Sequence, residues 1–416
     1  MTQPRDSHAS AVASSIATNV VSMALAGVAS LLAARLLGPH GRGQYAAVIV
    51  CASLASAIGD LGISQACSFY SAQNPREVGA VAGTAIGLGL ASSGILLLIL
   101  EPLCSRFFGG DIAAAARLYL FSVPFTMAAG CLTTIMLGLG HFGRFNFLKI
   151  TQAAGYVAGI AGAWLLGSAQ AGAVLTGVLL FQAIGTVVAV GCVTAVIPLA
   201  TWRFDLGIAR NLLSYGIRTY GGNLCWLANG RLDQALLTWL APMRDLGIYA
   251  VAVSYSNLQF GVSAAIATVA FSRTARSQTG AARRELGRGL ILSVGLTLPL
   301  AVVMALVARP AMRLLYGAAF VDAAPSACIL LLGGVFLGAN YVSSNCMRAG
   351  GRPGTPVIAE AGGLIVTLLA LPFAIAHWGI IGAAWGSVAS YAVTSAALAI
   401  LWKSPAAAPA RYQEAS

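Results

Sequence analysis

Residues 211–240 read NLLSYGIRTYGGNLCWLANGRLDQALLTWL, a mostly apolar stretch that is long enough to cross a bilayer as one helix. The stretch nevertheless carries Arg218, Arg231 and Asp233. A charged side chain in hydrocarbon costs roughly 2.5–3.5 kcal/mol on insertion scales, so a helix keeps such groups only where they face protein or water. The stretch therefore predicts a membrane helix that borders an interior cavity.

The composition predicts an all-α integral membrane protein. Mean hydropathy is +0.83, only 9% of the 416 residues are charged, and apolar runs of membrane-spanning length recur along the chain. The net charge of +12 is attributed to positive cytoplasmic loops, and no nucleic-acid partner is expected. The eight cysteines form no CxxC or Cys/His cluster, so neither a metal site nor another cofactor is expected. Nucleotide-binding and catalytic signatures are not seen either, which favours a protein that is not an enzyme.

The apolar runs predict twelve transmembrane helices, divided between an N-terminal lobe of six (1–205) and a C-terminal lobe of six (206–402), with a disordered tail (403–416). The expected spans are 9–34, 45–70, 78–100, 112–139, 146–168, 171–200, 211–240, 247–271, 289–308, 322–347, 354–376 and 379–401. The excess of Lys and Arg on one side places both termini in the cytoplasm, and it assigns Arg35 and Arg42 to a loop on the far side.

Weak internal repeats support the two lobes. Residues 43–46 (GQYA) match residues 247–250 (GIYA), with the two tyrosines 204 residues apart. Residues 106–109 (RFFG) match residues 313–317 (RLLYG), with the glycines 208 residues apart. An even number of spans in each half gives both halves the same orientation, which is a parallel repeat. Such a repeat holds its substrate between the halves and works by alternating access.

Several polar groups inside the spans need an explanation. On one helix Arg218 and Asn229 share a face, Asp233 lies one turn beyond Asn229, and Arg231 points about 160° away from Asn229. Arg218 either snorkels to the membrane surface or binds an anion; Arg231 and Asp233 either pair with neighbouring helices or line a cavity. Arginine is favoured for phosphate because its planar guanidinium offers a bidentate fork.

Asp60 lies near the middle of the second span, between Gly59 and Gly62. It either pairs with Arg218 or Arg231 or binds a coupling proton or cation. The flanking glycines predict close packing or a break in the helix.

Other polar groups have mainly structural interpretations. Arg117 is expected to snorkel, and Glu360 is expected to pair with Arg348 or Arg352. Asn340 is expected to join two helices by hydrogen bonds.

Several motifs along nearly the whole chain resemble bacterial polysaccharide exporters and O-antigen flippases of the multidrug/oligosaccharidyl-lipid/polysaccharide superfamily. The order and spacing of these motifs carry the resemblance: residues 34–45 (ARLLGPHGRGQY), 61–63 (LGI), 229–234 (NGRLDQ), 247–252 (GIYAVA), 315–320 (LYGAAF) and 378–384 (WGIIGAA).

The resemblance implies a V-shaped pair of six-helix bundles around a central cationic cavity. It also implies movement of an undecaprenyl-pyrophosphate-linked oligosaccharide, such as an O-antigen or exopolysaccharide repeat unit, across the bacterial plasma (inner) membrane. The candidate residues are Arg218, Arg231, Asn229 and Asn223 for substrate, and Asp60 and Asp233 for charge balance or coupling to H⁺ or Na⁺. The first span carries no charge before Arg35, unlike that of some lipid-flipping relatives, which leaves the substrate open.

Three other functions stay open: a cation-coupled multidrug exporter of the same superfamily, a membrane glycosyltransferase or ligase, and a scaffold subunit of a polysaccharide assembly complex. The expected partners are the lipid-linked oligosaccharide and membrane lipids, together with a polysaccharide polymerase and chain-length machinery.

Overall fold

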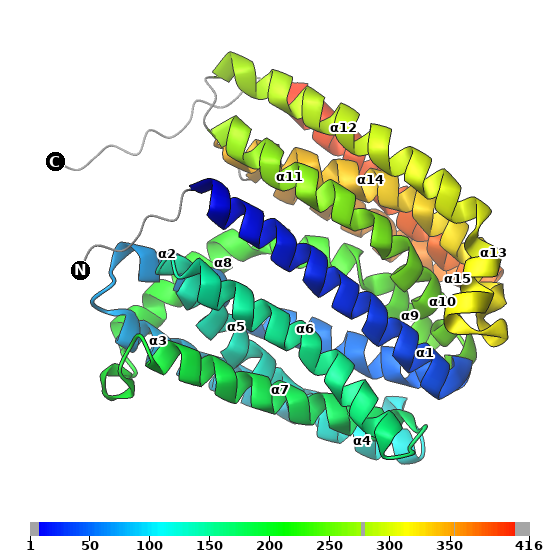
Figure 1. Ribbon diagram of the computed structural model, residues 1–416, viewed down its shortest axis with the longest axis horizontal. Helices are drawn as coiled ribbons and strands as arrows, with labels where there is room; N and C mark the ends of the chain where they lie inside the picture. The colour runs from blue at the N-terminus through cyan, green and yellow to red at the C-terminus, as the bar shows by residue number, and fades with distance from the viewer. Residues whose placement is uncertain (1–7, 276–278, 353, 404–416) are drawn as a thin grey trace.

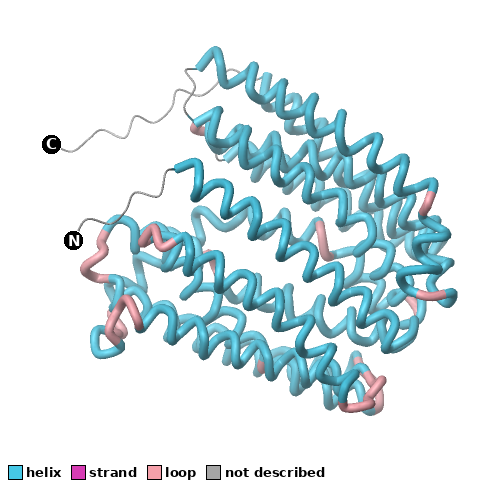
Figure 2. Tube along the Cα trace, in the orientation of Figure 1, coloured by secondary structure: helices cyan, strands magenta, loops and turns pink. Residues whose placement is uncertain are grey.

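The computed structural model describes residues 8–275, 279–352 and 354–403, and within these ranges the chain is helical with no strand (Figures 1 and 2). The first half consists of α1 (His8–Asp60), α2 (Ile63–Gln73), α3 (Val78–Phe107), α4 (Asp111–Leu120), α5 (Ser122–Gly138), α6 (Phe142–Leu165), α7 (Ala171–Thr194) and the short η1 (Leu199–Thr201). The second half consists of α8 (Leu206–Asn229), α9 (Leu232–Leu240), α10 (Met243–Ser256), η2 (Asn257–Gln259), α11 (Phe260–Ala275), α12 (Thr279–Leu306), α13 (Ala308–Ala311), η3 (Met312–Tyr316), η4 (Ala318–Ala323), α14 (Ala324–Ala349) and α15 (Gly354–Lys403).

The helices α1 and α15 are each too long to be a single crossing. They contain 53 and 50 residues, which would extend about 75–80 Å if straight, against a hydrocarbon thickness of about 30 Å. Each is interrupted by a glycine with positive φ, Gly38 (63°) and Gly379 (54°), where the chain turns back (Figure 1). Gly38 tolerates this conformation, and Pro39 after it cannot donate to the preceding turn.

Eight described helical segments are long and apolar enough to cross a membrane, and the α1 and α15 segments among them each include such a turn. The protein is therefore a multi-pass membrane protein with an all-helical fold. The total of twelve crossings stays a prediction. The predicted tail beyond Lys403 lies outside the described residues.

Hydrophobic packing divides the molecule into two lobes that join at one end. At the end that carries Gly38 and Gly379, here called the glycine-turn end, one apolar cluster includes residues of both halves, among them Tyr45 and Tyr249. At the opposite end, where α1 begins and α15 ends, one cluster forms around Leu132 of the first half, with Leu212 of α8 packed into it, and a separate cluster forms around Val342 of the second half. This pattern confirms two lobes joined as in a V, although the boundary at residue 205 stays a prediction, because the first half of α8 packs on α2.

Glycines allow the two lobes to touch backbone to backbone. A Cβ added at Gly43 on α1 would lie 1.7 Å from the carbonyl oxygen of Met243, and one added at Gly247 on α10 would lie 1.9 Å from that of Pro39. Gly43 and Gly247 are the equivalent positions of the predicted repeat. Equivalent positions of the two halves therefore contact each other across the lobe interface. This is expected for two halves related by an axis along the membrane normal.

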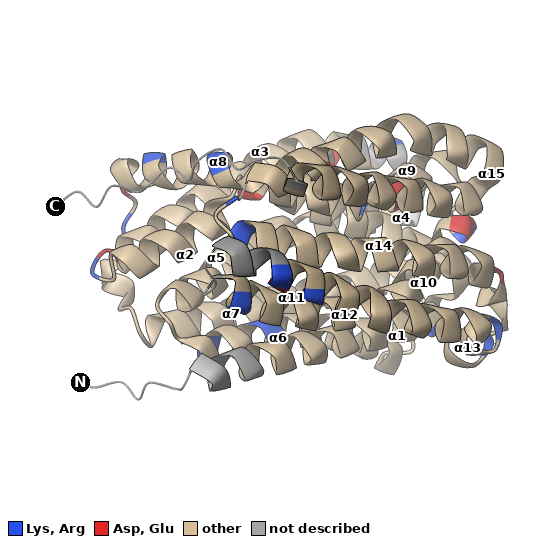
Figure 3. Ribbon diagram, turned by 90° about the horizontal axis from the view of Figure 1, so that it is seen from above, with Lys and Arg blue, Asp and Glu red and all other residues tan. Residues whose placement is uncertain are grey.

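Charged residues lie mostly toward the two ends of the helices, and the long middle stretches of ribbon are largely uncharged (Figure 3). The eight cysteines are all free. The few charged residues within the helical body, among them Arg42, Arg231 and Asp233, are therefore the candidates for a functional site.

Candidate functional site

Two adjoining cavities of about 450 and 460 Å³ lie between α1, α8–α9 and α10. Both are bordered by Met23, Ala26, Arg231, Val253 and Asn257. We call the first the basic cavity; its lining includes Arg42, Tyr45, Tyr156, Arg231 and Gln234. We call the second the aromatic cavity; its lining includes Trp226, Asp233, Phe260, Tyr341 and Tyr391.

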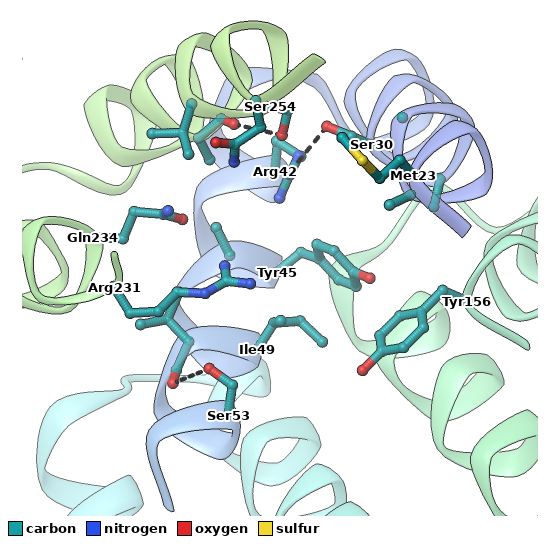
Figure 4. Close-up of a pocket in the computed structure, with 18 of the residues that line it drawn as sticks. Met23, Ser30, Arg42, Tyr45, Ile49, Ser53, Tyr156, Arg231, Gln234 and Ser254 are labelled. Atoms are coloured by element: carbon teal, nitrogen blue, oxygen red, sulfur yellow. Dashed lines mark hydrogen bonds between the residues drawn. The ribbon is translucent and has the colours of Figure 1, made fainter. Parts of the chain in front are cut away.

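Arg42 is the most deeply buried cation of the basic cavity. Only 7% of its surface is exposed, its Nη2 donates to Ser30 Oγ over 3.3 Å, and its guanidinium carbon lies 5.3 Å from the centre of the Tyr45 ring. Its Nε is buried with no hydrogen-bond partner among the described residues (Figure 4). A buried guanidinium without a carboxylate is costly, so this site is suited to an incoming anion.

The sequence-based assignment of Arg42 to a far-side loop is wrong. The helix resumes directly after Gly38 rather than at residue 45, so Arg42 lies in its first turns. Proline favours the first position of a helix, so Pro39 is the sequence signal for a helix that begins at residue 39 rather than at residue 45.

Arg231 lines the basic cavity from the second lobe. The predicted continuous helix over 211–240 is interrupted here: α8 ends at Asn229, α9 begins at Leu232, and Arg231 itself has a non-helical φ of −133°. The interruption directs the Arg231 side chain into the basic cavity (Figure 4), and the residue also lines the aromatic cavity. Asp233 is consequently not one helical turn beyond Asn229, as the sequence suggested.

The basic cavity has an excess of positive charge. Within the described parts of the chain, neither Arg42 nor Arg231 has a carboxylate at ion-pair distance, and the residues lining this cavity include two arginines and no acid. Tyr45 and Tyr156 complete the wall with their hydroxyl-bearing rings, and the Tyr156 hydroxyl accepts from Gln182 Nε2 over 2.9 Å (Figure 4). Two guanidinium groups with free donors and nearby hydroxyls have the chemistry that suits a phosphate-like anion.

Asp233 lies on the wall of the aromatic cavity, where it is 3% exposed. Its Oδ2 accepts from Tyr249 Oη over 2.6 Å and from Ser387 Oγ over 3.1 Å, and its Oδ1 accepts from Gln234 N over 2.7 Å. These neutral donors, rather than the ion pair considered from the sequence, hold the carboxylate in place.

The other predicted substrate residues lie outside both cavities. Arg218 and Asn223 are exposed on α8 and are not among the residues that line either cavity. Asn229 is buried, but its Nδ2 donates to Glu360 O and Oε2, each over 3.0 Å, and its Oδ1 accepts from Thr367 Oγ1. Asn229 therefore joins α8 to α15, and of the four predicted substrate residues only Arg231 borders the cavities.

Asp60 lies at the predicted break between α1 and α2, where Leu61 and Gly62 have positive φ. Its Oδ1 accepts from Ser64 N over 3.2 Å and from Ser64 Oγ over 2.6 Å, which stabilises the first turn of α2. No ion pair joins Asp60 to Arg218 or Arg231 among the described residues, so its predicted pairing with either arginine is wrong.

Of the remaining expectations, the pairing of Glu360 is wrong and the role of Asn340 is confirmed, and Arg117 has a carboxylate neighbour. Glu360 accepts from Asn229 rather than forming an ion pair with Arg348 or Arg352 in the described structure. Arg117 lies 3.6 Å from Glu101, with both side chains half-exposed. Asn340 joins α14 to α15, because its Nδ2 donates to Tyr391 O over 2.9 Å.

Similarity to known proteins identifies the family of this chain. Residues 32–325 match the sequence model of the family described as polysaccharide biosynthesis protein. The chain belongs to this family. It is also 28% identical over 197 residues to an uncharacterized membrane protein of Methanocaldococcus jannaschii, of whose length it matches only 38%.

Solved structures share the fold. The lipid II flippase MurJ in an inward closed conformation superposes with a TM-score of 0.78 at 16% identity, covering 93% of this chain and 87% of that one. An inward-facing multidrug resistance MATE transporter of the MOP superfamily superposes with a TM-score of 0.66 at 15% identity, covering 94% and 96%. This family member therefore has the fold of MOP-type flippases and transporters.

Proposed function

We propose that this protein flips an undecaprenyl-pyrophosphate-linked oligosaccharide from the inner to the outer leaflet of the bacterial plasma membrane by alternating access. The observation that carries the proposal is a cavity between the lobes that holds Arg42 and Arg231 without a neutralising carboxylate at ion-pair distance in the described structure. The pyrophosphate would occupy this cavity, and the polyprenyl tail would stay in the bilayer between the lobes. The termini would face the cytoplasm, as the Lys and Arg distribution favours.

Charge supports a phosphate substrate over an organic cation. An anion that enters the basic cavity gains two charge-assisted contacts and satisfies the free Nε of Arg42. A multidrug cation would instead meet two guanidinium groups at close range. Asp233 and Asp60 remain the candidates for charge balance or for response to H⁺ or Na⁺, because both are carboxylates within the helical body that have no cationic partner in the described structure.

The test is complementation together with transport by purified protein. Arg231→Ala and Arg42→Ala should each abolish surface polysaccharide in cells while the protein still reaches the membrane, and each should abolish flipping of a fluorescent polyprenyl-pyrophosphate-linked sugar in proteoliposomes. Arg218→Ala is the matched control, because it removes the same charge from an exposed position outside the cavities. Normal flipping by Arg231→Ala, or uptake of organic cations with no flipping by the wild-type protein, would contradict the proposal.

A further inference from the structure

The aromatic cavity differs chemically from the basic cavity beside it. Trp226 from α8, Phe260 from α11 and Tyr341 from α14 form one aromatic surface on its wall. The Phe260 and Tyr341 rings meet edge to face with centroids 5.1 Å apart, and the Trp226 and Tyr341 rings lie 6.3 Å apart. Aromatic faces of this kind bind the C–H faces of sugar rings, whose remaining edges carry hydroxyls.

Two donors on the wall of the aromatic cavity have no protein partner. Within the described part of the chain, Trp226 Nε1 and Ser22 Oγ are both buried without a hydrogen bond. A buried donor left unpaired costs about 1–3 kcal/mol, so such groups are expected to be satisfied by a ligand that enters the cavity. They come from opposite lobes, since Ser22 lies on α1 and Trp226 on α8, and one ligand bound here would contact both lobes.

The aromatic cavity also differs from the basic cavity in having an acidic residue on its wall. Asp233 lines it, its carboxylate accepts hydrogen bonds from the neutral groups of Tyr249, Ser387 and Gln234, and among the described residues no cation lies at ion-pair distance from it. Arg231 lies on the border with the basic cavity. The aromatic cavity therefore lacks the excess of positive charge found in the basic cavity, and an acidic group placed beside Asp233 would be repelled.

We infer that the aromatic cavity is a saccharide subsite, which holds the sugar next to the pyrophosphate by stacking on Trp226 and Tyr341 and accepts neutral sugars but not uronic acids. The sugar presents hydroxyl or acetamido oxygens to Trp226 Nε1 and Ser22 Oγ. This inference rests on the proposed function, because it places the pyrophosphate in the basic cavity and only the adjoining sugar in the aromatic one.

The experiment is calorimetric titration of the purified full chain with three soluble probes: citronellyl pyrophosphate, the same compound linked to N-acetylglucosamine, and the same compound linked to glucuronic acid. The neutral sugar should tighten binding roughly tenfold over the pyrophosphate alone, as one or two new hydrogen bonds and a stacking contact allow. The acidic sugar should bind no better than the pyrophosphate alone.

Variants separate the contacts of the subsite. Trp226→Phe keeps a ring but removes the N–H, and it should reduce the gain from the neutral sugar roughly fivefold while leaving the affinity for citronellyl pyrophosphate unchanged. Trp164→Phe, on the exposed face of α6, is the matched control and should change neither affinity. Asp233→Asn should raise the affinity for the glucuronic acid probe.

The outcomes distinguish failure of the proposed function from failure of the saccharide subsite alone. If citronellyl pyrophosphate does not bind, or binds equally well to Arg231→Ala, the proposed function fails and the subsite fails with it. If citronellyl pyrophosphate binds through Arg231 but the neutral sugar adds nothing, or Trp226→Phe leaves the gain intact, only the saccharide subsite is overturned. Equal binding of the neutral and acidic sugars would overturn the charge selection.

Discussion

Replacing Gly43 by alanine should weaken the contact between the lobes at the glycine-turn end. The added methyl would lie 1.7 Å from Met243 O and 2.6 Å from Met243 C, both backbone atoms that cannot rotate away. Since a carbon–oxygen contact normally needs about 3.3 Å, α1 and α10 must separate by roughly 1.6 Å at this point. Overpacking of this kind costs about 1–3 kcal/mol, and only the state in which the lobes touch here bears that cost.

The overpacking penalty lowers the population of the state in which the lobes touch at the glycine-turn end. A penalty of about 1–3 kcal/mol on the state closed at the glycine-turn end changes its ratio to the open state by roughly 5- to 150-fold. Spin labels at the exposed His40 and Arg244, in a background without native cysteines, would report this shift as longer distances in electron–electron double resonance. Gly247→Ala should act in the same direction, because its methyl would overlap Pro39 O at 1.9 Å.

Gly295→Ala is the matched control. It also places a methyl on a glycine within a helix, α12, but nothing lies within 4 Å of the new atom, so the label distances should not change. An unchanged distance distribution in both Gly43→Ala and Gly247→Ala would refute the reasoning that these glycines seal the interface.

Three further predictions concern single contacts. Asn229→Ala should lower the free energy of unfolding by about 1–3 kcal/mol, because the buried network with α15 loses its donor, whereas the exposed Asn223→Ala should change the melting temperature little. Tyr249→Phe removes a 2.6 Å donor from the buried carboxylate of Asp233, and differential scanning fluorimetry should show a lower Tm, by an amount equivalent to about 1–3 kcal/mol. Arg117→Ala breaks only a half-exposed ion pair, so any stability change above about 1 kcal/mol in chemical denaturation would contradict that assignment.

The sequence by itself determined the fold class, because hydropathy and helix length depend only on local composition. Runs of apolar residues predicted a multi-pass helical protein, and the equivalent GQYA and GIYA segments predicted two related halves. It also singled out Arg231 and Asp233 as charges that required an interior position, and both line a cavity. Glycines beside Asp60 predicted close packing or a break in the helix, and the helix does break at Leu61 and Gly62.

Only the tertiary structure decided which polar groups share a cavity. Residues 218, 223 and 229 lie on α8, before the break at Arg231, and the break changes the direction of the chain from Arg231 onward, so spacing along one ideal helix could not place them. Arg42 is close to Arg231 in the cavity although the two are far apart in sequence and come from different lobes. Their meeting depends on how two lobes pack through glycine contacts, and that packing is a long-range property that no local pattern encodes.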